Sequence, residues 1–287
     1  MPKKLEDIVG KVYQTNSGVD CVVVEYRGST NVKVRFLDKF GYEMNTCLTS
    51  LRAGKVKNPF APKVFGVGYL GEGRHIPSKN GVKSPAYVQW HSMLRRGYDN
   101  DYKDENPSCV QSYVCEEWHC FDTYADWFYQ QKGWDKRFQL DKDIKGDGTQ
   151  KYSPSPCCLV PPIINTMFND NKFRDNGLPL GVSIDSWSKD FLVVISKWGK
   201  LSRVGVYKSS KEAFKAYKSE RESYIKEVAN EWKEYLDDDV FDIIYNTEVG
   251  ESGCLSKEES AFKFHETGEV EIPEYYQDNL HLVVSYE

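Results

Sequence analysis

Two aspartates separated by one residue, and an asparagine further along the chain, are the residues of this sequence best suited to chemistry. Asp141 and Asp143 lie within the stretch 140–144, and Asn165 follows in a later segment. Carboxylate and amide oxygens suit Mg²⁺ or Mn²⁺, and few protein ligands are needed because water and phosphate complete the coordination shell. A cation held in this way can bind a phosphodiester and stabilise its leaving group. The pattern therefore predicts a metal site formed by Asp141, Asp143 and Asn165.

A strand, a turn, a second strand and a short helix are expected to position these side chains. On an extended strand Asp141 and Asp143 share a face, and Lys142 points to the opposite one. Glycines let the chain reverse in the turn, and Pro162 suits the start of a helix that carries Asn165. The expected elements are strand 140–144, turn 145–148, strand 152–160 and a helix from 162.

Each of these residues also has a simpler interpretation. Paired aspartates beside a glycine turn are often solvent-facing, and Asn165 could be an ordinary residue near a helix end. Lys142 is a poor candidate for a general base because lysine is an ammonium ion at neutral pH. His119 is the nearest histidine in the sequence. It could serve as the base, or it could be a packed residue of the core.

The N-terminal residues 1–62 are expected to form a small SH3-like β-barrel. Short alternating segments are separated by turn-forming residues, and about five strands fit in this length. Lys33 and Arg35 are the residues of this segment expected to contact DNA phosphates. Residues 58–62 contain two prolines and form a plausible linker.

Residues 63–176 are expected to form the central domain, with helices at 86–96 and 121–131 around the strand–turn–strand–helix unit. Its sequence at 66–71 formally matches G-x-G-x-x-G. Pro77 and a polar stretch follow where a nucleotide-binding helix should begin, so close approach of the backbone to another segment explains the glycines better.

Residues 177–236 are expected to form a three-stranded sheet backed by one helix. The strands are predicted at 180–184, 191–197 and 203–207, and Ser209 begins the helix. One helix cannot cover both faces of a sheet, so the other face is free to enter a DNA groove, or it is simply a solvated basic face. The residues expected to contact DNA are Ser183, Trp187, Lys189, Lys197, Lys200 and Arg203.

The net charge of −5 conceals an uneven distribution. Residues 1–230 carry a net charge of +8 and residues 231–287 carry −13. A basic body suits a phosphate-backbone binder, while the acidic extension at 237–287 could bind a host protein or could only increase solubility. No stretch resembles a signal peptide or a membrane span, and a cytoplasmic protein is expected. The eight cysteines are expected to be reduced, and a structural Zn²⁺ site is not expected because the knuckle spacing is absent.

The residues of the central and C-terminal segments resemble a known family. Leu140-Asp141-Lys142-Asp143-Ile144 with Tyr152-Ser153-Pro154 and Cys157, preceded by Val114-Cys115-Glu116-Glu117-Trp118, resembles phage-type HNH endonucleases. Residues 181–183, 191–195 and 212–217 resemble the AP2 DNA-binding module that is often fused to them in homing endonucleases.

The resemblance implies a multidomain α+β protein with an SH3-like barrel, a ββα-metal unit and an AP2-like sheet. It implies a Mg²⁺- or Mn²⁺-dependent endonuclease acting on double-stranded DNA in the cytoplasm of an infected bacterium. Asp141 and Asn165 would be metal ligands. The family's usual histidine beside the aspartate is replaced by Lys142, and Pro156 stands where related sequences have asparagine. The alternative is a catalytically degenerate relative that acts as a DNA-binding regulator or binds a host factor.

Overall fold

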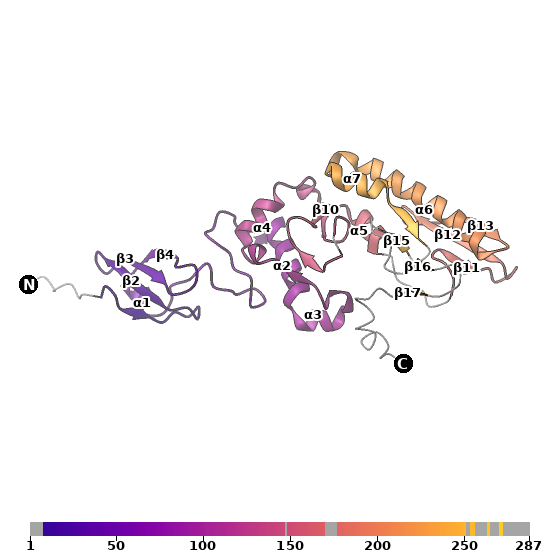
Figure 1. The fold of residues 1–287 in the computed structure, drawn as a ribbon. Coiled ribbons are helices and arrows are strands. Elements are labelled where there is room, and N and C mark those ends of the chain that lie inside the picture. The colour runs from indigo at the N-terminus through magenta and orange to yellow at the C-terminus, as the bar shows by residue number, and fades with distance from the viewer. Residues whose placement is uncertain are drawn as a thin grey trace, which may run out of the picture. The chain divides into compact units, whose positions relative to one another are not determined.

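The chain folds into two compact units. The first contains residues 1–130 and 150–153, and the second contains residues 131–149 and 154–287. The computed structural model describes residues 8–146, 148–169 and 177–250, together with the strands β15 (Gly253–Leu255), β16 (Lys263–Phe264) and β17 (Val270–Glu271). The fold is mixed α+β with several small sheets, which confirms the predicted class (Figure 1). The finer boundaries at 62, 176 and 236 stay a prediction.

The first unit begins with an antiparallel sheet in the order β1-β2-β3-β4, beside which helix α1 lies. These elements are β1 (Val12–Tyr13), β2 (Cys21–Tyr26), β3 (Val32–Phe36), β4 (Glu43–Thr46) and α1 (Leu48–Arg52). Alternation in β3 buries Val32, Val34 and Phe36. Within the described residues β1 and β4 do not pair, so the sheet is open and the expected closed barrel is not formed. Helix α1 instead covers the core with Leu48 and Leu51.

The rest of the first unit is mainly helical. It contains β5 (Ser78–Lys79), β6 (Val82–Lys83), α2 (Pro85–Tyr98), α3 (Asn100–Glu105), η1 (Pro107–Cys109), β7 (Tyr113–Val114), η2 (Glu116–His119), α4 (Phe121–Phe128) and β9 (Lys151–Tyr152). Helices α2 and α4 match the two predicted helices and pack against each other. Trp90 and Trp118 are fully buried between these segments, and Trp90 Nε1 donates to the Trp118 carbonyl at 2.7 Å. The tryptophans of this region therefore form its core.

The glycines at 66–71 are explained by close packing. A Cβ on Gly68 would lie 2.4 Å from Leu94 Cδ1. Gly71 has a φ of +91°, and a Cβ there would lie 2.7 Å from Asp122 Oδ2. Both positions need glycine because the backbone lies directly against α2 and α4. This agrees with the expectation that the motif reflects close backbone approach.

The second unit has one large core that joins most of its elements. It contains η3 (Trp134–Lys136), β8 (Gln139–Asp141), β10 (Cys158–Val160), α5 (Pro162–Asn169), β11 (Val182–Ile184), β12 (Phe191–Lys197), β13 (Lys200–Tyr207), α6 (Ser210–Trp232), η4 (Lys233–Tyr235), α7 (Asp238–Tyr245) and β14 (Glu248–Gly250). The sheet β11-β12-β13 and helix α6 were predicted, and the Ser209 side chain caps α6 by accepting from the Glu212 amide at 3.2 Å. Residues of α6, α5, β10 and the sheet pack together in this core.

Two segments differ from the prediction. The expected strand 152–160 is two strands: β9 pairs in parallel with β7 in the first unit, and β10 pairs with β8 in the second. Pro154 and Pro156 separate them, since proline fixes φ and has no N–H for a ladder. Helix α7 was not expected. Val240 and Ile244 bury one of its faces, and the acidic residues Asp238 and Asp239 in its first turn favour a helix start.

The sequence of residues 281–286 predicts a terminal strand, and this segment lies outside the described residues. Among the helices that the structure describes, none is long and apolar enough to cross a membrane.

Candidate functional site

Strands β8 and β10 and helix α5 form a ββα arrangement within the second unit. The two strands are antiparallel, with Asp141 opposite Cys158 and Gln139 opposite Val160. Helix α5 follows β10 and contacts β8. Asn165 Nδ2 on α5 donates to Gln139 Oε1 at 2.6 Å, which ties the helix to the strand. Because Gln139 and Asp141 are two residues apart on one strand, they share a face.

Asp141 is the most unusual member of this group. Its side chain is buried at the end of β8, and the residue is only 5% exposed. Its Oδ1 atom accepts hydrogen bonds from the backbone amides of Asp143 and Ile144, both at 2.8 Å. Oδ2 accepts no hydrogen bond from the residues that the structure describes. Burial raises the pKa of Asp141 above its usual value, the two amide bonds oppose this effect, and the negative charge of Asp143 adds to it.

Asp143 does not lie on the strand as expected. Strand β8 ends at Asp141, and the chain bends over 142–145 because the Asp141 carboxylate accepts hydrogen bonds from the backbone amides of Asp143 and Ile144. Asp143 is exposed, and its Oδ1 is 2.6 Å from Lys142 Nζ. Lys142 is itself buried, with 7% of the residue exposed. The expectation that the two aspartates share one strand face is therefore wrong.

The donor atoms suit a hard cation. Asp141, Asp143 and Asn165 all belong to the second unit and supply carboxylate and amide oxygens. In the described part of the chain, no group of three or more His, Cys, Asp or Glu side chains is arranged to hold a metal ion. The predicted site is not such a group, because only Asp141 and Asp143 are of these residue types and its third member is an asparagine. The metal site therefore fits Mg²⁺ or Mn²⁺ in ligand type and stays a prediction.

His119 lies in the first unit, at the end of η2. Its Nε2 atom is 2.8 Å from the hydroxyl of Tyr98, which also donates to the Val114 carbonyl at 3.0 Å. Burial lowers the pKa of His119, so the neutral ring predominates at pH 7. These contacts give His119 a clear packing role, and its use as a general base stays a prediction.

The register of the β11-β12-β13 sheet separates the expected DNA-contact residues into two groups. Val193 and Ile195 face α6 and are buried, so Lys197 lies on the same covered side. Lys197 Nζ bonds Glu220 Oε2 of α6 at 2.7 Å, and Lys200 pairs with Lys197 across the hairpin. The expectation that Lys197 and Lys200 belong to the uncovered face is therefore wrong.

Ser183 and Arg203 do lie on the uncovered face. Ser183 is paired with Leu192, and Arg203 is paired with Val194. A bulge shifts the register between Val193 and Val194, which places Arg203 on this side. Trp187 and Lys189 lie in the turn between β11 and β12, and Trp187 is 94% exposed. An indole exposed to this extent is available to contact another molecule.

Lys33 and Arg35 project together from β3 on the face opposite its core side. Both are paired with one residue of β4: Lys33 Nζ is 2.7 Å from Glu43 Oε2, and Arg35 is 2.6 Å from Glu43 Oε1. These bonds lower the pKa of Glu43, which keeps it charged. One carboxylate thus offsets part of the positive charge expected to contact DNA.

Sequence reasoning missed Gln139 and Cys158. Gln139 precedes Asp141 by two positions, and strand periodicity could have placed it on the same face. The position of Cys158 opposite Asp141 depends on the register, which the sequence does not specify locally. A comparison of the chain with models of protein families, with characterised proteins and with solved structures finds no match to any of them.

Proposed function

We propose that this protein is a DNA endonuclease of the phage HNH type, which hydrolyses phosphodiester bonds with Mg²⁺ or Mn²⁺. The observation that carries the proposal is the ββα arrangement of β8, β10 and α5. It places a buried aspartate, Asp141, at the end of the first strand. It also joins Asn165 of the helix to the same strand through Gln139.

Asp141, Asp143 and Asn165 would hold the cation. When bound, such a cation binds a phosphate oxygen and stabilises the leaving group. The two backbone amides that donate to Oδ1 orient the Asp141 carboxylate, and Oδ2 accepts no hydrogen bond from the described residues. Lys142 holds Asp143 through their ion pair and supplies a positive charge near an incoming phosphate. The activation of water falls to Asp143 in this proposal.

The DNA-binding part of the proposal rests on the β11-β12-β13 sheet. Arg203 and Ser183 project from the face that α6 leaves uncovered, and Trp187 and Lys189 extend from the adjoining turn. A sheet face of this kind can enter a major groove, with cations meeting phosphates at its edges. The proposed partner is double-stranded DNA, in the cytoplasm of an infected bacterium.

Plasmid nicking tests the catalytic proposal. Purified wild-type protein with supercoiled plasmid and Mg²⁺ or Mn²⁺ should produce nicked or linear DNA. Asp141→Asn and Asn165→Ala should each reduce the rate at least 100-fold, while the exposed-surface control Asp101→Asn should cleave at the wild-type rate. Lack of cleavage by wild-type protein with every metal and substrate tested would refute the catalytic proposal.

One observation favours a second candidate, a DNA-binding protein that does not cleave. The Asp143 carboxylate is already bonded to the Lys142 ammonium, and this lysine stands where the family has a histidine. Sequence-selective binding without cleavage would support this candidate. A version that binds a host protein through residues 237–287, most of which lie outside the described residues, predicts that deleting them abolishes the interaction and leaves DNA binding intact.

A further inference from the structure

A continuous stretch of the first unit carries positive charge without any negative charge. Residues 73–98 contain five Lys and Arg residues and no Asp or Glu. They form the hairpin β5–β6 and helix α2, which begins directly after the hairpin at Pro85. None of the residues from which DNA contact was expected lies in this stretch.

The base of the hairpin is fixed to the body of the unit. Asp122 on α4 is 1% exposed and accepts three backbone hydrogen bonds. Oδ2 accepts from the amides of Gly73 at 2.8 Å and Arg74 at 3.2 Å, and Oδ1 accepts from His75 at 2.9 Å. The Ser84 amide donates to the Pro77 carbonyl at 2.9 Å and closes the hairpin. The hairpin is thus held in place before it meets any partner.

The tip of the hairpin is exposed. Asn80 and Gly81 have φ values of +53° and +80°, which fit a two-residue turn with Asn-Gly. Val82 is 72% exposed and Ile76 is 64% exposed, so apolar side chains stand among the charged ones. The tip of the hairpin is therefore exposed, and the hydrogen bonds at its base hold it to the rest of the unit.

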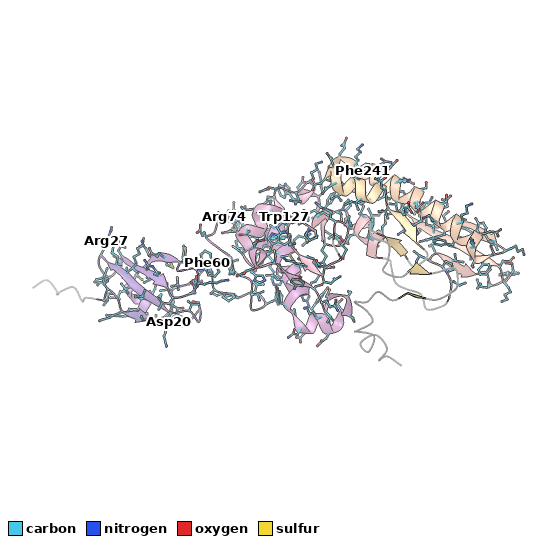
Figure 2. All side chains as sticks on the ribbon, in the orientation of Figure 1. Asp20, Arg27, Phe60, Arg74, Trp127 and Phe241 are labelled. Atoms are coloured by element: carbon cyan, nitrogen blue, oxygen red, sulfur yellow. The ribbon has the colours of Figure 1, made fainter. Side chains whose placement is uncertain are left out.

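Two lysines of the hairpin are available for a partner. Lys79 and Lys83 are exposed and form no ion pair with any residue in the described ranges. Arg74, labelled in Figure 2, differs because its guanidinium is 2.5 Å from Asp126 Oδ2. Lysines without a carboxylate partner can bind phosphate without first breaking an ion pair.

The positive surface continues along α2. Tyr87, His91 and Arg95 are spaced four residues apart on α2, so they follow one side of the helix, and Lys83 lies at the end of β6 directly before it. Lys83 Nζ is 5.8 Å from the centre of the Tyr87 ring. Burial lowers the pKa of His91, and the positive charges of Lys83 and Arg95 lower it further, so both cations lie close enough to His91 to affect its ring. Arg95 also bonds Asp99 at 3.2 Å, so it contributes less free charge than the lysines.

We propose that Lys79, Lys83 and Arg95 form a second DNA-contact surface, which binds the phosphate backbone of a DNA duplex. The charge of the stretch and its fixed, exposed hairpin support a nucleic-acid partner in preference to an apolar one. This inference rests on the proposed action on DNA, and it is independent of whether the protein cleaves.

The test is the salt dependence of binding by the full-length protein. Fluorescence anisotropy with a labelled DNA duplex of random sequence would be measured from 0.05 to 0.3 M NaCl for wild type and K79Q/K83Q. Losing two phosphate contacts should weaken binding roughly tenfold or more at 0.1 M salt. The slope of log K against log salt should become shallower by about 1.8. The control K211Q/K215Q removes the same charge from exposed positions of α6 and should stay within twofold of wild type.

Each outcome gives a distinct answer. Weaker binding and a shallower slope for K79Q/K83Q alone support the proposed DNA-contact surface. If the wild-type protein then cleaves no plasmid, only the catalytic proposal fails. Equal effects of the two double variants, or no effect of either, overturn the surface while the proposed function stands. Absence of duplex binding by wild type overturns both. Matching melting temperatures of the variants and wild type verify that all are folded.

Discussion

Replacing Asp141 by alanine should destabilise the protein much more than replacing it by asparagine. The Asp141 carboxylate is buried, and its Oδ1 atom accepts from the amides of Asp143 and Ile144 at 2.8 Å. Asparagine keeps an oxygen acceptor at this position, whereas alanine leaves both amides without a partner. A buried amide left unpaired costs about 1–3 kcal/mol, so Asp141→Ala should lower the free energy of unfolding by about 2–4 kcal/mol. Asp141→Asn should remain within about 1 kcal/mol of wild type at acidic pH.

The difference between wild type and Asp141→Asn should depend on pH. Burial, with a smaller effect of the Asp143 charge, raises the pKa of Asp141 in the folded protein. The folded state therefore binds this proton more tightly than the unfolded state, and wild-type stability falls as the pH rises. Relative to Asp141→Asn, the loss begins near the ordinary aspartate pKa of about 3.9 and ends above the raised pKa. Its slope cannot exceed about 1.4 kcal/mol per pH unit.

Urea-induced unfolding from pH 3.5 to pH 8 checks both expectations. The exposed Asp101→Asn is a matched control that should show no such pH-dependent difference. Mg²⁺ at ten times its dissociation constant should stabilise wild type by about 1.4 kcal/mol and should not stabilise Asp141→Asn. The reasoning is refuted if asparagine destabilises as much as alanine, or if the difference between wild type and Asp141→Asn is the same at every pH.

Three further predictions concern DNA binding by the β11-β12-β13 sheet, the packing of Gly181 against α6, and the reactivity of the cysteines. Arg203→Gln should weaken duplex binding severalfold in an anisotropy assay, whereas Lys197→Gln should not, because Lys197 is bonded to Glu220 on the covered side of the sheet. Gly181→Ala should lower the unfolding free energy by about 2–4 kcal/mol in urea titrations, since φ is +73° and its Cβ would lie 2.1 Å from the Tyr217 ring; a neutral effect would contradict the close packing of this glycine against α6. Among the cysteines whose surroundings the structure describes, Cys47 should react first with a thiol reagent, because hydrogen bonds with Ser50 lower its pKa. Cys158 should react last of these, because burial raises its pKa well above the usual value, and Cys47→Ser should remove the fast phase.

The elements that follow local patterns agree with the sequence-based expectations. Alternation of valine with lysine and arginine identifies β3, and the cap at Ser209 identifies the start of α6. The segment from 152 to 160 shows the limit of this reasoning. Its alternation favours one strand, but two prolines divide it, and its halves pair with strands of different units. Pairing partners are distant in sequence, so a local pattern does not reveal them.

For the candidate site, the sequence by itself determined which chemical groups are present: the carboxylates of Asp141 and Asp143, the amide of Asn165 and the order of strand, turn and helix around them. Only the tertiary structure decided that Asp141 is buried while Asp143 is exposed and bonded to Lys142. It also decided, through a one-residue bulge in β13, that Arg203 lies on the face of the sheet that α6 leaves uncovered. Residue type and local geometry are set along the chain. Burial and strand register arise from packing between distant segments, and a shift of one residue reverses the direction of a side chain.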